Sequence, residues 1–177
     1  MAITKIQSES LNLADTYDFT GTVTGAGGVN TPAFEARLSS AQLGISSATL
    51  TKIAYATELF DTDSNYDTSN YRFTPTTAGK YHVYATQRIT TTNNTTLKRT
   101  ILKVYKNGSR YEKSEADFNL EDSKQRATSP SVQATIPMNG SSDYIEIFGY
   151  VENSNGATTS TGFDISASVF GAYKIIE

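Results

Sequence analysis

The chain has no cysteine and no tryptophan, and among its 177 residues it has a single histidine. Without cysteine, disulfides and thiol chemistry are excluded. Because His82 has no second histidine or cysteine to act with, the common zinc sites and Cys–His catalytic pairs are also excluded. It stands in the strand-like segment KYHVYATQ, which is typical of a side chain on a sheet face. We therefore expect a protein that is not an enzyme, with no catalytic residue, no metal and no cofactor.

Charge and long apolar runs are also scarce. Only 19% of the residues are charged, and the formal net charge is −3. A nucleic-acid-binding protein normally has a basic face, whereas the densest basic run here, Leu97–Lys103, fits the polar positions of a strand. A membrane helix needs about 20 consecutive apolar residues, and no segment comes near that length. Met1–Ser10 lacks the apolar run of a signal peptide. The sequence predicts no nucleic acid as a partner, no membrane insertion and no secretion.

What the chain does have is Thr, Ser, Asn and Gly, with 11 tyrosines and 8 phenylalanines. Thr and the aromatic residues favour strands, and Gly and Asn favour the turns between them. Two Asn-Gly pairs, at Asn107 and Asn139, each stand between strand-like runs and predict hairpins. About eight to ten short antiparallel strands with turns between them predict an all-β jelly-roll sandwich.

The clearest strand is the last, GFDISASVFGAYKII. Its period of two predicts one apolar face, formed by Phe163, Ile165, Ala167, Val169, Tyr173 and Ile175. Residues 114–126 are the only plausible helix. Because Phe118 and Leu120 are two positions apart and share no helical face, we expect a long polar loop there instead.

Residues 1–31 differ from the rest, because they hold few large apolar side chains and many Gly and Thr residues. Such a segment cannot bury enough surface to fold alone. We expect an anchoring arm that becomes ordered by docking on another protein, and a frayed terminus is the alternative. The large side chains that would anchor the arm are Leu11, Leu13, Tyr17, Phe19 and Val23. Residues 32–177 would form the globular head.

The stretch FDTDSNYDTSNYRF, residues 60–73, has acidic or amide side chains at alternate positions, as a calcium loop would. An EF-hand loop counted from Asp61 needs Gly at its sixth position and Glu at its twelfth. Tyr66 and Arg72 stand there instead. We expect a structural loop that Phe60 and Phe73 anchor in the core. A weakly bound calcium ion remains the alternative.

The segment YIEIFGYVE predicts a strand with Ile145, Ile147 and Val151 on one face. Its other face would carry aromatic side chains that are exposed on a monomer. A contiguous apolar patch normally marks an interface, and a threefold ring closes such a patch against its copies. We therefore expect a homotrimer whose interface includes Phe148, Tyr150 and Phe170. Loops that cover these side chains are the alternative.

Several short motifs occur in a characteristic order. They are Pro32-Ala33-Phe34, then Phe60-Asp61 with Tyr66-Asp67, then Arg72-Phe73-Thr74-Pro75, and then GKYHV at residues 79–83. In this order and spacing, residues 32–177 resemble the globular head of complement component 1q, which shares the jelly roll of tumour necrosis factor. The resemblance implies a jelly-roll fold and a homotrimer. Animal members are secreted and follow a collagen stalk, and this chain has neither signal nor Gly-X-Y repeat.

The opening residues, MAITKIQSESLNLADTYDFTGTVTGAGG, are similar to the N-termini of structural proteins of tailed bacteriophages, including cyanophages. This similarity implies a virion structural protein, made in the host cytoplasm and placed at the virion surface. Residues 1–31 would dock on other virion proteins. The trimeric head would act as a short fibre or fibre tip in host attachment, with a host surface glycan or protein contacted by the loops at 61–71 and 111–126.

Three other functions stay open at this point. A capsid decoration protein, of the cement or head-fibre kind, would use the same trimeric head on another part of the particle. Paired Asp and Glu residues leave room for a polysaccharide-degrading enzyme. A signalling ligand of the tumour necrosis factor kind is a more distant fit, because it would need secretion.

Overall fold

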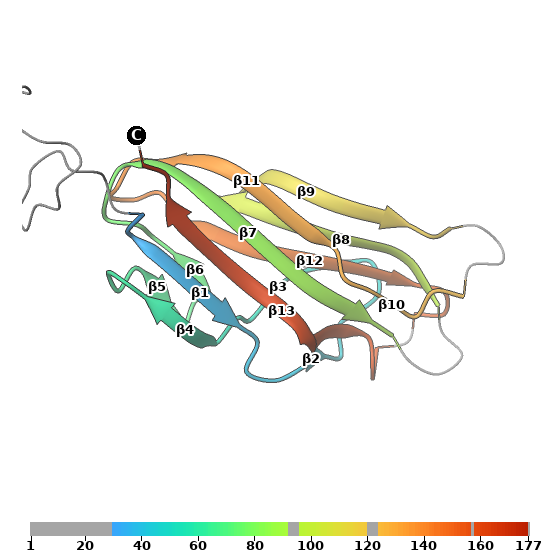
Figure 1. Cartoon of the computed structure of the whole chain (residues 1–177). Helices are drawn as coiled ribbons and strands as arrows, with labels where there is room; N and C mark the ends of the chain where they lie inside the picture. Colours follow the sequence, from blue (N-terminus) through green and yellow to red (C-terminus); the bar gives the residue numbers. More distant parts are fainter. Residues whose placement is uncertain (1–29, 92–95, 120–123, 157, 177) are drawn as a thin grey trace, which may run out of the picture.

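The computed structural model describes residues 30–91, 96–119, 124–156 and 158–176, which form a sandwich of two antiparallel sheets (Figure 1). The predicted all-β jelly-roll class is confirmed. The arm residues Leu11, Leu13, Tyr17, Phe19 and Val23 lie outside the described residues. None of the described residues forms a helix long and apolar enough to cross a membrane.

One sheet has seven strands and the other has six. The seven-stranded sheet contains β10 (Ala127–Thr128), β11 (Ser131–Met138), β7 (Gly79–Thr90), β13 (Gly162–Lys174), β2 (Gln42–Leu43), β1 (Ala33–Arg37) and β4 (Thr57–Asp61). The six-stranded sheet contains β5 (Tyr66–Asp67), β6 (Arg72–Phe73), β3 (Thr49–Lys52), β12 (Ile145–Asn153), β8 (Leu97–Lys106) and β9 (Ser109–Asp117). In Figure 1 the seven-stranded sheet is in front, and β8 and β12 lie behind it.

The core lies between the sheets, where alternate side chains of each strand point inward. Phe34 of β1 stacks on Tyr66 and on Phe73, with ring centroids 4.5 Å apart in each pair. Phe170 of β13 packs edge-on against Phe34 at 4.9 Å. Its exposed fraction is 0%. The prediction that Phe170 is an exposed interface residue is therefore wrong, because this residue faces the other sheet rather than solvent.

β13 does not have the single apolar face that its alternation predicted. Its pairing with β7 jumps from Asp164–Arg88 to Ser168–Gln87, so a bulge holds three extra residues. Phe163 and Phe170 both point into the core, while Ile165 lies in the bulge with 51% of its surface exposed. The Asp164 carboxylate accepts hydrogen bonds from the backbone N–H and hydroxyl of Ser166, which fixes the bulge. A bulge with an odd number of extra residues reverses the faces of the residues that follow it.

The two Asn-Gly pairs behave differently. Asn107 and Gly108 have φ of 52° and 75° and join β8 to β9 in the predicted hairpin. The hairpin predicted at Asn139-Gly140 is wrong, because β11 pairs with β7 and β12 pairs with β8 in the other sheet. The Asn139 side chain accepts hydrogen bonds from the backbone N–H groups of residues 141, 142 and 143. This segment therefore connects the two sheets.

The segment at 114–126 is only partly the polar loop that we expected. Its first four residues continue β9, which pairs with β8 as far as Asp117 opposite Arg99. β9 is a polar strand at the edge of its sheet. Its sequence therefore lacks the alternation of apolar residues from which a strand can be predicted.

Candidate interaction surface

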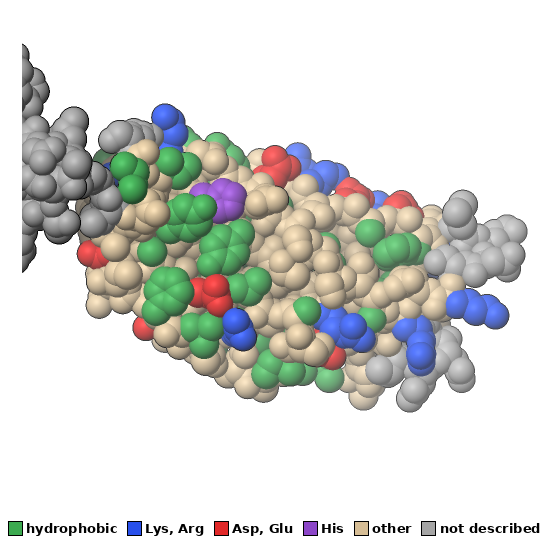
Figure 2. All heavy atoms as spheres, viewed as in Figure 1, with side chains coloured by type: hydrophobic (Ala, Val, Ile, Leu, Met, Phe, Trp, Pro, Cys, Tyr) green, Lys and Arg blue, Asp and Glu red, His purple; other side chains and the backbone are tan. Residues whose placement is uncertain are grey.

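The outer face of the seven-stranded sheet carries a group of aromatic side chains. Strand register places Tyr173 opposite His82, Gly171 opposite Tyr84, and Glu35 opposite Phe60. We call Phe60, His82, Tyr84 and Tyr173 the aromatic face. Figure 2 shows green apolar side chains gathered around the purple histidine at one end of this sheet, while its other end is mostly tan and blue.

Three of the four rings of this face, those of His82, Tyr84 and Tyr173, pack on one another. The His82 ring lies 5.3 Å from that of Tyr173 and 6.2 Å from that of Tyr84, centroid to centroid. The Tyr84 ring lies across Gly171, where any Cβ would overlap it. The Tyr84 hydroxyl donates a hydrogen bond to Glu35 Oε2 at 3.0 Å. Burial, together with this bond to a carboxylate, raises the pKa of Tyr84 to about 12, so the hydroxyl remains a donor.

Two members of the aromatic face are exposed, and the other two, His82 and Tyr84, are partly buried. Phe60 is 47% exposed and Tyr173 is 38% exposed, and Leu59 and Ile165 are also exposed large apolar residues. Single exposed apolar residues are ordinary, but a contiguous patch marks a contact surface. The arrangement is chemically suited to burial against another protein, with the Glu35–Arg37 pair (3.2 Å) lying between Phe60 and the other rings.

Of the residues predicted for the trimer interface, Phe148 and Tyr150 lie together on the outer face of the six-stranded sheet. Both are half-buried by neighbours of their own chain. Phe148 packs on Tyr105 with ring centroids 4.5 Å apart. The Tyr150 hydroxyl donates to Glu152 Oε2 (3.1 Å) and accepts from the Arg99 guanidinium (3.3 Å). An interface through these two residues remains a prediction.

The acidic loop after β4 directs its carboxylates at its own backbone. Asp61 accepts hydrogen bonds from the N–H groups of Asp63 (3.2 Å) and Tyr66 (2.7 Å). Hydrogen bonds from the Ser69 and Asn70 side chains and from the Ser69 backbone hold the pKa of the Asp67 carboxyl well below its usual range. In the described part of the chain, no group of three or more His, Cys, Asp and Glu side chains could hold a metal ion.

The anchoring of this loop differs from prediction at one of its two ends. Phe73 is fully buried as expected, whereas Phe60 points out of the sheet onto the aromatic face. Tyr66 is buried instead, stacked on Phe34, and its hydroxyl donates to the Tyr55 carbonyl at 2.8 Å. In FDTDSNYDTS the tyrosine, rather than the first phenylalanine, is the residue that holds the loop on the core.

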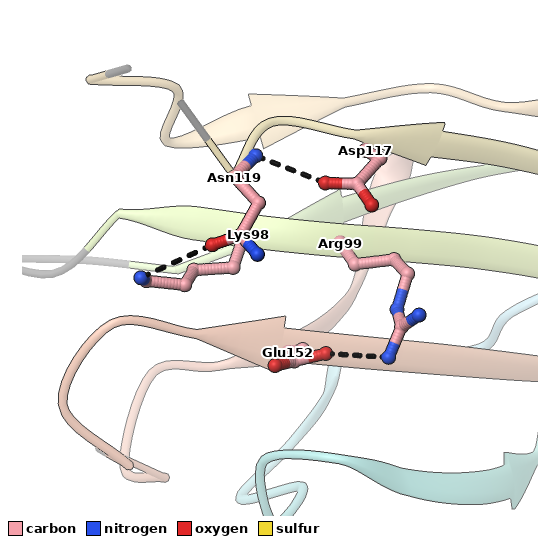
Figure 3. A pocket seen from close by; sticks show the side chains of 5 residues that line it. All are labelled: Lys98, Arg99, Asp117, Asn119 and Glu152. Carbon is pink, nitrogen blue, oxygen red and sulfur yellow. Dashed lines mark hydrogen bonds and ion pairs between the residues drawn. The ribbon is translucent and has the colours of Figure 1, made fainter. Parts of the chain in front are cut away.

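A small polar cavity lies where β8, β9 and β12 meet (Figure 3). Its volume is about 70 Å³, room for a few water molecules. Its side chains already bind one another: Arg99 contacts Glu152 at 2.9 Å, and Lys98 contacts Asn119 at 3.3 Å. The cavity is too small for a sugar ring.

Sequence reasoning did not identify the aromatic face. The alternation in KYHVYATQ was enough to place His82 and Tyr84 on one face of a strand. The contact of His82 with Tyr173, and the position of Phe60 in the same row as Tyr84, depend on which strands become neighbours. That is set by pairing between β1, β4, β7 and β13, which are distant in the sequence.

The fold resembles two solved structures. The globular domain of zebrafish complement 1qA has a TM-score of 0.57 and 14% identity, covering 81% of this chain and 96% of that one. The Eiger tumour necrosis factor of S. frugiperda has a TM-score of 0.58 and 10% identity, covering 81% of this chain and 91% of that one. The described residues thus have the jelly-roll fold of complement 1q and tumour necrosis factor globular domains.

At the sequence level, the chain is 33% identical over 130 residues to the uncharacterized protein YqcC of Bacillus subtilis strain 168. The match covers 72% of this chain and 34% of YqcC, so the chain spans about a third of the length of the curated relative it matches. No protein-family model matches the chain.

Proposed function

We propose that this chain is a non-enzymatic bacteriophage virion structural protein whose head domain forms a homotrimer at the virion surface. The observation that carries the assembly is the aromatic face. On an isolated domain it leaves Phe60 and Tyr173 partly in water. A closed threefold ring would bury this surface against its own copies. The jelly-roll fold of complement 1q and tumour necrosis factor domains supports this choice of assembly.

Self-association through the aromatic face is favoured over the face that carries Phe148 and Tyr150. Burial of an ion pair in an interface is costly unless its partners remain fully hydrogen-bonded. The face around Tyr150 holds Arg99 with Glu152, and Lys52 with Glu146. The aromatic face contains one such pair, Glu35 with Arg37, and Lys80 lies beside His82 on β7; its burial would remove mainly the apolar surface of the rings from water.

The proposed place of the head on the particle depends on the sequence of its arm. Residues 1–31 resemble the short Gly- and Thr-rich arms of tailed-phage proteins, and we propose that they dock on another virion protein. The head would then project outward as a short fibre or fibre tip in host attachment. In Figure 1 the start of β1 lies at one end of the sandwich, and β10 lies at the other. The end near β10 would therefore face the host. The loop at 61–71 begins beside the start of β1, where Thr62 bonds to Ala33, so of the two loops expected to contact the host only the segment at 111–126, through β9, runs toward that end.

The assembly is tested by light scattering of the purified full chain and of matched variants. We expect three times the chain mass for the wild-type protein at micromolar concentration. Phe60→Arg and Tyr173→Arg should both give the mass of a monomer, because each places a charge on the aromatic face. Phe148→Arg is the control and should remain trimeric. A monomeric wild-type protein, or dissociation by Phe148→Arg alone, would overturn the assignment.

The location is tested by antibody labelling of virions in negative stain. Label at the tail or its fibres supports the attachment role. Label over the capsid faces would replace it with a decoration role, and particles without label would overturn the virion assignment altogether.

A further inference from the structure

The outer face of the six-stranded sheet holds an unusual row of cations. Strand register places Lys52 opposite Phe148, Phe148 opposite Lys103, and Lys103 opposite Lys113. Three lysines and one phenylalanine therefore form a line across β3, β12, β8 and β9. In the adjacent row, Tyr105 of β8 lies between Arg110 of β9 and Glu146 of β12.

The facing lysines of this row do not stabilise the sheet. Like charges directly opposite each other destabilise a strand pair, and Lys103 faces Lys113 across β8 and β9. Lys52 and Lys113 are each paired with a carboxylate, Glu146 and Glu115 respectively. Lys103 has no ion-pair partner among the described residues. Burial first, and then the nearby charges of Arg110 and Lys113, lower its pKa.

The cations surround a pair of aromatic rings. Phe148 and Tyr105 pack with centroids 4.5 Å apart and planes tilted by 44°, and both remain partly exposed. Aromatic faces pack against the apolar faces of sugar rings, and the Tyr hydroxyl can hydrogen-bond. Along β8 the row that contains Lys103 and the row that contains Tyr105 are separated by about 7 Å, two residues of a strand. The two rows together carry four cations, and the carboxylates of Glu146 and Glu115 each pair with one of the lysines.

We propose that this lysine–aromatic surface, formed by Lys103, Tyr105, Arg110, Lys113 and Phe148, binds an acidic polysaccharide. The lysines and arginine would pair with anionic groups of successive sugars, and the two rings would pack on a sugar face. The biological setting rests on the proposed function, because a host-contacting head needs a ligand on the host surface. The surface is on the opposite sheet from the aromatic face, so it stays accessible in the proposed trimer.

An acidic sugar chain is favoured over nucleic acid as the occupant. The rings of Phe148 and Tyr105 are tilted toward each other, so they do not form parallel platforms for successive bases.

Titration calorimetry of the full chain with a polygalacturonate oligomer tests the proposal. A neutral dextran oligomer and an oligothymidylate of similar length are the comparison ligands. We expect binding of polygalacturonate that weakens as salt is raised, and no heat with dextran. Absence of polygalacturonate binding, equal binding of dextran, or tighter binding of oligothymidylate would overturn the proposal.

Substitutions on the lysine–aromatic surface test whether polygalacturonate binds there. Lys103→Gln with Lys113→Gln should weaken polygalacturonate binding at least tenfold and flatten its salt dependence. Phe148→Ala should weaken it with the salt dependence unchanged. Lys124→Gln with Arg126→Gln is the control, because it removes the same charge from exposed residues near β10. An equal loss in this control would show a general charge effect and overturn the site.

Measurements of melting temperature and of solution mass distinguish loss of the binding site from unfolding and from loss of the trimer. The lysine variant relieves the repulsion between β8 and β9 and also removes the Lys113–Glu115 pair, an exposed pair that contributes little, so its melting temperature should stay close to that of the wild-type protein. A lower melting temperature would attribute the lost binding to unfolding and overturn the site. Polygalacturonate binding by a wild-type protein that scatters as a monomer would support this site while overturning the proposed trimer.

Discussion

At the scale of single residues, the aromatic side chains divide into three environments. Phe34, Phe73 and Phe170 are fully buried between the sheets. Phe60 and Tyr173 lie on one outer face, and Phe148 lies on the other. The residue type is similar in all of these positions, so the energetic role of each ring depends on the side of the strand from which it projects.

Truncation of a core ring and a surface ring should therefore differ in effect. We expect Phe170→Ala to lower the free energy of unfolding by about 3–5 kcal/mol, since it removes contacts with Phe34, Tyr55 and Tyr66 and leaves a cavity. Phe148→Ala should lower it by about 1 kcal/mol. Urea unfolding of both variants measures the difference. Equal losses of unfolding free energy in the two variants would contradict the orientations of the two rings. If Phe170→Ala does not fold, Phe170→Leu replaces it in the measurement.

At the scale of elements, one carboxylate joins three strands of the six-stranded sheet. Glu146 of β12 has a side chain that is only 5% exposed, and its Oε1 accepts from Lys52 of β3 at 2.6 Å and from Arg72 Nη2 of β6 at 2.8 Å. The Arg72 guanidinium also lies 3.8 Å from the centre of the Tyr144 ring. β6 has two residues and β3 has four, so neither strand has many backbone hydrogen bonds of its own.

Removal of this carboxylate should loosen the edge of the sheet. We expect Glu146→Ala to lower the free energy of unfolding by about 1–3 kcal/mol, less than for a fully buried pair because Lys52 and Arg72 can reach water. Hydrogen exchange should quicken at β3 and β6 before β8. Glu152→Ala, which breaks the more exposed pair with Arg99, is the control and should have a smaller effect. Unchanged exchange at β3 and β6 would argue against the linking role of Glu146.

At the scale of the whole molecule, the two sheets present different chemistry to their surroundings. The seven-stranded sheet presents the aromatic face, and the six-stranded sheet presents lysines and arginines around Phe148 and Tyr105. We propose the first surface for self-association and the second for an anionic ligand. A jelly roll suits this division because its two outer faces point in opposite directions.

Self-association should make thermal stability depend on concentration. A subunit that binds the folded chain stabilises it by mass action. We expect the melting temperature of the wild-type protein to rise with protein concentration over the range in which the trimer forms. The Tyr173→Arg variant should show no such rise. Scanning calorimetry at several concentrations measures this, and a concentration-independent wild-type melting temperature would speak against the trimer.

The sequence predicted the fold class well because alternation along a strand is a local property. Buried Ile145, Ile147 and Val151 in β12 match their predicted face, and Asn107-Gly108 forms the predicted turn. The failures are at non-local features. The β13 bulge reversed the predicted face at Phe170, and partner choice between sheets undid the hairpin at Asn139-Gly140.

The sequence by itself determined that the described chain forms a β-sandwich without thiols, with turns at particular Asn and Gly residues, because these features follow from side-chain chemistry and backbone preference over a few residues. Only the tertiary structure decided which side chains meet. Tyr173 reaches His82, and Lys103 faces Lys113, only after strands that are distant in the sequence pair in one register. Register depends on packing across the whole sandwich, so it cannot be derived from any single segment.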